Sequence, residues 1–320
     1  ADGSFKRQKN MFSTPFGTKS GELPVEQGRY RLIWAAPCPW SHRAVIVRKL
    51  LGLEDTISLG MVDPIRPQVP RIDWAFSLDA EGVDPVLGIK YLSEIYTRTD
   101  PHYQGRPTVP VMIDVKENKV VNNDYFKLTI YFETVFKPFH KQNAPDLYPE
   151  NLRQEIDALN EVIFKEVNNG VYQCGFARSQ EAYESAYDTL FERLEGLEKR
   201  LSTRRFLLGD FITDADVRLY VTLVRFDIAY YTVFKANKKP ISDYPNLWAY
   251  ARDLYQTPGF GDTTDFEAIK EHYYVSARLS PGKGTEDIII PKGPDLSAWN
   301  DPPEREHLSQ LKNKYLIQSS

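Results

Sequence analysis

The residue best placed for covalent chemistry is Cys38, in the stretch APCPWSHR, residues 36–43. It lies between two prolines, directly after an apolar run and directly before a stretch with helical spacing. At the start of a helix, unpaired backbone N–H groups and the positive end of the helix dipole stabilise a thiolate, the nucleophilic form of cysteine. Pro39 suits the first helical position, where its missing N–H would have had no partner. These features favour a nucleophile over a small residue packed under a sheet.

The surroundings of Cys38 limit the chemistry it can do. Three residues later the chain has Ser41, so the motif C-P-W-S offers no second thiol, and we expect an external thiol to resolve any mixed disulfide. The other cysteine, Cys174, is expected to be a buried small residue, with a resolving thiol as the alternative. Two cysteines are too few for a disulfide framework, which favours a reducing cytoplasm.

A second signal is TVPV, residues 108–111. In thioredoxin-like folds a proline at this place is usually cis, and the backbone of the residue before it faces a bound thiol peptide. A cis X-Pro bond is uncommon and tends to be retained for a reason. A proline on an edge strand explains the same residues equally well. The signal therefore gains its weight from the pairing with Cys38.

Composition and charge exclude several other functions. The chain of 320 residues has 42% hydrophobic and 26% charged residues and a formal net charge of −4, so we predict neither nucleic-acid nor membrane binding. It has no apolar run near the roughly 18 residues of a membrane span, and its first residues lack the apolar centre of a signal peptide. The five histidines show no ligand spacing, so we predict no metal.

The elements that must position Cys38 follow from hydrophobic periodicity. A strand, a helix ending at Gly52 and a second strand suggest a parallel βαβ unit, and a hairpin and a helix follow later. The segments are, in order, residues 29–36, 40–53, 56–62, 108–122 and 124–136. This βαβ-ββα order is that of an α/β thioredoxin-like domain, with Cys38 where the first strand meets the first helix.

The second half of the chain reads as helical. Residues 137–149 carry three prolines and no clear period, which suits a linker. Helices are predicted over residues 151–167, 179–203 and 216–234, the last one begun by a capping box between Thr213 and Asp216. We therefore expect two domains: an N-terminal extension with the thioredoxin-like domain over residues 1–140, and an all-helical domain with an irregular C-terminal tail over residues 141–320.

Many segments in one order resemble the glutathione transferases, and among them the Xi class, the glutathionyl-hydroquinone reductases. They include GSFKRQ, APCPWSHRAVIVRKLLGLEDTIS, DPHYQGRPTVPV, NNGVYQCGFA, FLLGDFITDADVRLYVTLVRFD and YPNLWAYARDLYQTPGF. The resemblance implies a glutathione-transferase-like fold, usually dimeric. It also implies that Cys38 attacks the sulfur of a glutathionyl-hydroquinone, releases the hydroquinone and is left as a mixed disulfide, which a second glutathione resolves.

The resemblance further implies roles for individual residues. Trp74 matches the tryptophan that covers glutathione, Arg106 matches an arginine of the glutathione site, and Val109 offers its backbone to the tripeptide. Tyr172 and Tyr273 match tyrosines around the quinone ring, where phenol groups can hydrogen-bond its oxygens. From the residues alone, Trp74 could instead anchor its loop, Arg106 could form a structural ion pair, and the two tyrosines belong to a pool of 19.

Two departures from the family pattern bear on the substrate. Where the family usually has SNES, this chain has NNDY, so Asp124 replaces a glutamate and Tyr125 replaces the serine that receives the γ-glutamyl end of glutathione. Either the ring of Tyr125 swings aside or the chain uses another low-molecular-weight thiol. The segment near Ala277, where the family usually has a histidine, is also altered.

Other functions remain compatible with these residues. The near relatives are a glutathione-dependent thioltransferase and a dehydroascorbate-type reductase. From a different class, a transferase-fold protein that has lost glutathione and acts as a non-catalytic binding protein would also accommodate Tyr125.

Overall fold

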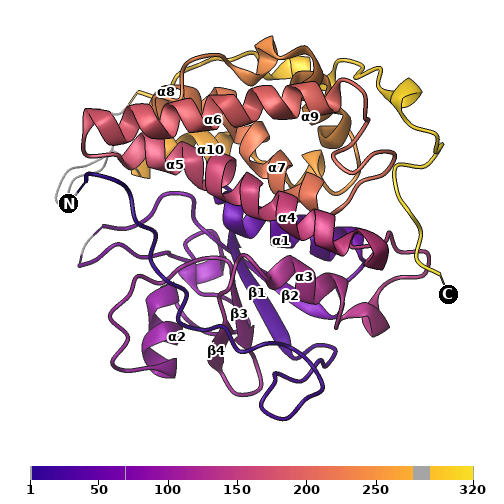
Figure 1. The fold of residues 1–320 in the computed structure, drawn as a ribbon. Coiled ribbons are helices and arrows are strands. Elements are labelled where there is room, and N and C mark those ends of the chain that lie inside the picture. The colour runs from indigo at the N-terminus through magenta and orange to yellow at the C-terminus, as the bar shows by residue number, and fades with distance from the viewer. Residues whose placement is uncertain (1, 69, 277–288, 320) are drawn as a thin grey trace. The chain divides into compact units, whose positions relative to one another are not determined.

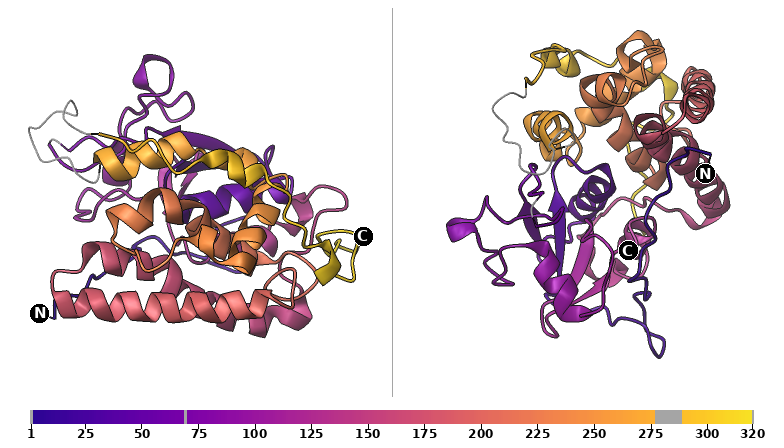
Figure 2. Two further views of the ribbon diagram at one scale, coloured as in Figure 1. Left: turned by 90° about the horizontal axis from the view of Figure 1, so that it is seen from above. Right: turned by 90° about the vertical axis from the view of Figure 1, so that its left-hand side faces the viewer.

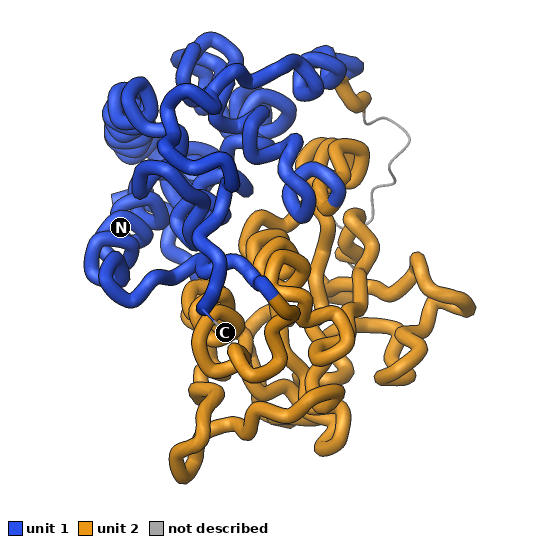
Figure 3. Tube along the Cα trace, turned by 90° about the vertical axis from the view of Figure 1, so that its right-hand side faces the viewer, with its two compact units in different colours: residues 1–7, 143–262, 292–320 blue, residues 8–142, 263–291 orange. Residues whose placement is uncertain are grey.

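A computed structural model describes residues 2–68, 70–276 and 289–319. By their contacts the residues fall into two compact units, which Figure 3 colours separately. One unit combines Ala1–Arg7, Asn143–Asp262 and Lys292–Ser320, and the other combines Gln8–Gln142 with Thr263–Pro291. The segment from Thr263 thus contacts the unit that holds the sheet, while the domain boundary between residues 140 and 141 remains a prediction.

The sheet unit contains the four strands expected from the sequence. Its four strands lie in the order β2-β1-β3-β4 (Figure 1). β1 is parallel to β2, with Tyr30 opposite Ile57, and β3 is antiparallel to both β1 and β4. The strands are β1 (Tyr30–Ala35), β2 (Ile57–Val62), β3 (Val111–Asp114) and β4 (Lys119–Asn122). With α1 (Pro39–Leu50) between β1 and β2, the predicted thioredoxin-like arrangement is confirmed.

The other helices of the sheet unit differ from the expectation in detail. Gly52 follows the end of α1 with φ +70°, as a helix stop should. α3 (Leu128–Glu133) is shorter than predicted, because the carbonyl of Asp124 accepts the N–H groups of residues 127 and 128 in a turn before the helix. α2 (Leu92–Thr99) and α10 (Phe266–Glu271) were not predicted.

The helical unit is built around α6, a long straight helix in Figure 2. Its N-cap Ser179 accepts the N–H of Ala182, and four leucines at helical spacing, Leu190, Leu194, Leu197 and Leu201, are buried. α7 begins directly after Thr213, whose N–H donates to Asp216 Oδ2 at 2.9 Å, as the sequence signal predicts. The helices of this unit are α4 (Arg153–Ile163), α5 (Asn169–Phe176), α6 (Gln180–Leu201), α7 (Asp214–Arg225), α8 (Tyr231–Val233) and α9 (Pro245–Tyr255).

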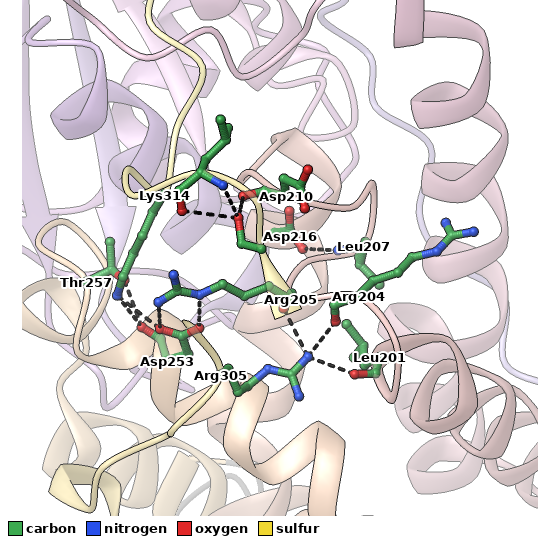
Figure 4. A network of polar contacts seen from close by, with 12 residues as sticks. Leu201, Arg204, Arg205, Leu207, Asp210, Asp216, Asp253, Thr257, Arg305 and Lys314 are labelled. Atoms are coloured by element: carbon green, nitrogen blue, oxygen red, sulfur yellow. Dashed lines mark hydrogen bonds and ion pairs between the residues drawn. The ribbon is translucent and has the colours of Figure 1, made fainter. Parts of the chain in front are cut away.

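The C-terminal tail of the helical unit is held by buried charges (Figure 4). Arg305 donates to the carbonyls of Leu201, Arg204 and Arg205, which stabilises the end of α6. Lys314 pairs with Asp253 at 3.0 Å. Three backbone hydrogen bonds also attach the tail. The N–H of Ile212 donates to the carbonyl of Lys314, the N–H of Asp146 donates to that of Leu316, and the N–H of Gln318 donates to that of Ala144. The irregular tail is thus fixed along its length.

None of the helices in the described ranges has both the length and the apolar character that crossing a bilayer requires.

Candidate active site

Cys38 lies at the junction that the sequence predicts. It is the N-cap residue of α1, its N–H donates to the Ala35 carbonyl at 3.0 Å, and its carbonyl accepts the N–H of His42 at 3.0 Å. The side chain is 8% exposed, and its S–H can donate to the carbonyl of Val109 over 3.7 Å. The thiol therefore points across from the helix start to the loop before β3.

The two residues that follow Trp40 are held by the backbone and by a distant segment. The hydroxyl oxygen of Ser41 lies 3.1 Å from the carbonyl oxygen of Ala35 and 3.3 Å from that of Cys38, so its O–H can donate to either. His42 is fully buried, and its Nε2 lies 2.9 Å from Thr263 Oγ1. Ser41 thus braces the turn that carries Cys38, and His42 connects α1 to the segment before α10.

Val109 meets Cys38 across this turn. The Val109–Pro110 bond is cis, which confirms the prediction made from TVPV. Val109 is buried, its carbonyl faces the thiol of Cys38, and its N–H donates to none of the described residues. An extended peptide lying beside Cys38 would find this N–H available as a donor.

Trp74 and Tyr273 both contact His272. The ring of Trp74 stacks on that of His272, with centroids 5.6 Å apart and planes inclined by 13°, and Tyr273 meets the same histidine edge-on at 5.0 Å. Nδ1 of His272 lies 2.8 Å from the carbonyl of Pro64. Both predicted residues are buried, at 6% and 2% exposure. The histidine therefore brings them together, although 199 residues of sequence separate them.

Arg106 is exposed, and its backbone rather than its side chain is fixed. Its N–H donates to Gln8 Oε1 at 2.9 Å, and its carbonyl accepts from the phenol of Tyr103 at 2.8 Å. Within the described ranges its guanidinium makes no ion pair or hydrogen bond. The structural ion pair considered from the sequence has no partner there, and the charge is available to an anion.

Asp124 and Tyr125 lie in the turn before α3. Both are half-buried, and the Asp124 N–H donates to Asn122 Oδ1 at 2.9 Å. The ring of Tyr125 packs on Trp40 of α1 with centroids 5.0 Å apart, and its carbonyl accepts from Arg43 at 3.0 Å. The ring of Tyr125 thus lies against the helix that begins at Cys38.

Tyr172 belongs to the other compact unit, on α5. The guanidinium of Arg7 lies 4.8 Å from its ring centroid, and Phe234 lies 5.0 Å away. On the same helix Cys174 is 1% exposed, and burial raises the pKa of its thiol to about 12. Ala277 lies outside the described residues.

Several residues that contribute to this site were not found from the sequence. His272 directly precedes Tyr273 but gave no signal of its own. Asn123, in the segment NNDY that departs from the family pattern, was not singled out either. Their roles depend on contacts between distant segments, which no local spacing encodes. Over the residues with described positions, no group of three or more His, Cys, Asp or Glu could hold a metal ion.

Comparisons with known proteins agree with this geometry. A model of the glutathione S-transferase N-terminal domain matches residues 37–135, and the corresponding C-terminal domain model matches residues 180–253. Glutathionyl-hydroquinone reductase YqjG of Escherichia coli is 41% identical over 93% of this chain and 90% of that protein. Its glutathione-bound structure matches with a TM-score of 0.81 at 40% identity, over 95% of this chain and 98% of that chain.

Two further solved structures are similar along most of their length. A glutathione transferase from Gordonia bronchialis has 52% identity and a TM-score of 0.83, over 89% of this chain and 87% of that one. The Xi class transferase from Natrialba magadii has 37% identity and a TM-score of 0.84, over 93% and 89%. The chain therefore belongs to the glutathione transferase family of enzymes, within its Xi class.

Proposed function

We propose that the protein reductively cleaves glutathionyl-hydroquinones through a mixed disulfide between Cys38 and glutathione. The observation that carries the proposal is the position of Cys38 at the start of α1, with its sulfur 3.7 Å from the carbonyl of Val109 beside a cis proline. The name of the Escherichia coli relative, glutathionyl-hydroquinone reductase, supports the substrate class.

The reaction balances without a metal or a further oxidant. The Cys38 thiolate attacks the sulfur of the thioether, an S–S bond forms and the bond from sulfur to the aromatic carbon breaks. The ring carbon keeps that electron pair and takes a proton, which yields the hydroquinone. A second glutathione thiolate then attacks the mixed disulfide, so that glutathione disulfide leaves and Cys38 regains its thiolate. One aryl thioether and one thiol thus give one arene and one disulfide.

The thiol peptide would be held by the sheet unit. The N–H of Val109 and the guanidinium of Arg106 have no partner among the described residues, so the first can bond the peptide backbone and the second can receive a carboxylate. Asp124 can accept from the α-amino group of the γ-glutamyl end. Trp74, fixed by its stack on His272, would cover the peptide.

The aromatic leaving group would be handled by the two predicted tyrosines. Tyr273 is fixed by its edge-on contact with His272, and a neutral phenol can donate to a hydroquinone oxygen. Tyr172 would do the same from α5, where Arg7 lies over its ring. We expect each phenol to contribute to the rate rather than to glutathione binding.

The position of Tyr125 is the reason to consider a second class of thiol co-substrate. Its packing on Trp40 places a bulky ring in the turn where the family has a small serine, so a low-molecular-weight thiol other than glutathione is the alternative co-substrate. Glutathione-dependent thioltransfer or reduction of dehydroascorbate would use the same Cys38 chemistry. A binding protein without catalysis would use none of it.

The decisive experiment incubates wild type and Cys38→Ser with a glutathionyl-hydroquinone and a panel of thiols. Intact-protein mass spectrometry detects the mixed disulfide, and chromatography detects the hydroquinone. Wild type should carry one glutathione adduct and release hydroquinone, and Cys38→Ser should do neither. If no thiol yields an adduct and no hydroquinone is released, the protein is not an enzyme of this kind.

We also propose that the protein is a cytoplasmic homodimer. The family is usually dimeric, and two free cysteines suit a reducing compartment. Light scattering coupled to gel filtration tests the assembly, and a monomer at micromolar concentration would contradict it. Fractionation of the source cells tests the compartment.

A further inference from the structure

The N-terminal segment Gln8–Thr14 touches both loops to which glutathione binding was assigned above. One is the loop before β3, which carries Arg106 and Val109, and the other is the turn after β4, which carries Asp124 and Tyr125. Of this segment, only Gln8 belongs to the family-like stretch GSFKRQ, residues 3–8. Gln8–Thr14 and both loops belong to the sheet unit.

At the first loop, Gln8 holds the main chain of Arg106 from both sides. The N–H of Arg106 donates to Gln8 Oε1 at 2.9 Å, and Gln8 Nε2 donates to the Arg106 carbonyl at 3.3 Å and to the phenol oxygen of Tyr103 at 3.2 Å. Tyr103 itself donates to the same carbonyl at 2.8 Å. The peptide groups of Arg106 are thus fixed, while its guanidinium bonds to no other residue that the structure describes.

At the second loop, the segment pairs with the end of β4. The N–H of Asn123 donates to the Phe12 carbonyl at 2.8 Å, and the N–H of Phe12 donates to Asn123 Oδ1 at 3.2 Å. Asn122 Nδ2 donates to the Thr14 carbonyl at 2.9 Å. Residues 122 and 123 come directly before Asp124, so this pairing sets where the turn begins.

Asn123 also joins the two loops directly. It is 1% exposed, and its Nδ2 donates to the phenol oxygen of Tyr96 at 3.1 Å and to Thr108 Oγ1 at 3.3 Å. The phenol of Tyr96 donates in turn to the Thr108 carbonyl at 2.8 Å. Thr108 precedes Val109, so a continuous set of hydrogen bonds runs from the turn after β4 to the backbone beside Cys38.

Aromatic packing supports this set of bonds. Phe12 lies 5.7 Å from the ring of Tyr96 and 5.8 Å from that of Tyr103, and the two tyrosines stack at 5.1 Å. Burial raises the pKa of Tyr96 to about 12, so its phenol keeps its proton at neutral pH and can donate.

We propose that Gln8 and Asn123 are positioning residues for the thiol substrate: together they set the spacing between the Arg106–Val109 loop and the Asp124–Tyr125 turn. The inference rests on the proposed function, because it assumes that glutathione lies between these loops. Neither residue needs to touch glutathione. Loss of either set of hydrogen bonds leaves the Cys38 thiol in place and lets the binding groups shift, so affinity falls and chemistry at saturation does not.

The first test measures glutathione binding by calorimetry on the Cys38→Ser protein, which cannot turn over. Adding Gln8→Ala should raise Kd about tenfold, because it removes the bonds to both peptide groups of Arg106. Gln8→Glu keeps the Oε1 acceptor and should recover part of the affinity. The matched control is Gln104→Ala, two residues from Arg106, whose amide donates only to the His102 carbonyl in the described parts of the chain and which should leave Kd unchanged.

The second test probes the Asn123 connection through Tyr96→Phe, since the smaller change protects folding. It removes the oxygen that links Asn123 to the Thr108 carbonyl and keeps the ring stack. In the protein with Cys38 intact, KM for glutathione should rise about fivefold and kcat should stay within about twofold. If the Tyr96 hydroxyl had a purely structural role, Tyr96→Phe would instead lower the melting temperature and the fraction of active protein. The apparent kcat would then fall while KM stayed unchanged.

The outcomes separate this inference from the proposed function. If glutathione binds Cys38→Ser but the intact protein releases no hydroquinone, the proposed function fails and the calorimetric comparison still decides the positioning role. If Gln8→Ala binds glutathione as tightly as its parent, or if no glutathione binds at all, the positioning role is wrong.

Discussion

The surroundings of Cys38 and Cys174 differ in their backbone more than in their exposure to solvent. Both side chains are buried, at 8% and 1% exposure. Cys38 caps α1 and faces the loop of a cis proline, whereas Cys174 lies inside α5. Burial raises the pKa of Cys174 to about 12, against a weaker lowering by the charge of Lys235. The position in a helix therefore distinguishes the candidate nucleophile from the packing residue, although both cysteines are buried.

The largest expected effect separates the two thiols by activity. Cys38→Ser should lower hydroquinone release by at least about a thousandfold, because the serine hydroxyl is not ionised at neutral pH and cannot form the mixed disulfide. Cys174→Ser should retain activity within about twofold. Steady-state rates with a glutathionyl-hydroquinone provide the measurement, with folding checked by circular dichroism. Equal losses in both variants would remove the distinction between the thiols.

Alkylation should separate the thiols next. At pH 8 a thiol with a pKa of about 12 is ionised to roughly one part in ten thousand, so iodoacetamide should label Cys174 only after unfolding. Cys38 should be labelled at least about a hundred times faster in the native protein. Peptide mapping over a time course measures both rates. Native labelling of Cys174 at a rate similar to that of Cys38 would contradict the comparison.

A thiol placed beside Cys38 should change the fate of its mixed disulfide. Ser41 lies one turn on, with its oxygen at 3.3 Å from the Cys38 carbonyl, so Ser41→Cys supplies the resolving thiol that Cys174 is not expected to supply. The glutathione adduct on Cys38 should fall about tenfold in favour of an internal disulfide. Ser41→Ala, which adds no thiol, is the control and should keep the adduct. An undiminished adduct in Ser41→Cys would mean that the two sulfurs cannot meet.

The smallest expected effects are on the free energy of unfolding, which the two cysteine-to-serine changes should shift in different directions. Cys174→Ser buries a hydroxyl in place of a thiol and should cost about 1–3 kcal/mol of unfolding free energy. The side chain of Cys38 makes no capping hydrogen bond to α1, and serine is a preferred capping residue, so Cys38→Ser should be neutral or stabilising by up to about 1 kcal/mol. Urea unfolding of both variants provides the values. A larger loss for Cys38→Ser would show that Cys38 is needed for packing.

Much of the fold was predictable because its signals are local. Alternating and helical periods marked β1, α1, β2, the hairpin and α6, and the two prolines around Cys38 marked the start of α1. α2 was not predicted because its N-cap is Tyr91, whose N–H donates to Glu94 Oε2, rather than a usual capping residue, and because it lies inside an insertion without a clear period. The start of α3 moved because Asp124 turns the chain first.

The site was less predictable because its contacts join distant parts of the chain. Cys38, Val109 and the cis bond could be inferred from spacing, and Arg106 was available from the family pattern. Three contacts of the site link residues far apart in the sequence. Trp74 stacks on His272, 198 positions away, Tyr125 packs on Trp40, 85 positions away, and Gln8 hydrogen-bonds to Arg106, 98 positions away. No hydrophobic period or cap records such pairings, so only the folded chain could supply them.

The charged attachment of the C-terminal tail has a consequence for synthesis. Lys314 reaches Asp253, and the backbone of residues 314–318 bonds to Ala144, Asp146 and Ile212, which were made much earlier. A ribosome synthesises the chain from its N-terminus, and its exit tunnel covers the few tens of residues made most recently. The helices therefore emerge before residues 314–318 can bond to them. The contacts of the tail can form only once residues 314–318 have left the tunnel, whereas Gln8–Thr14 is available to β4 as soon as that strand emerges.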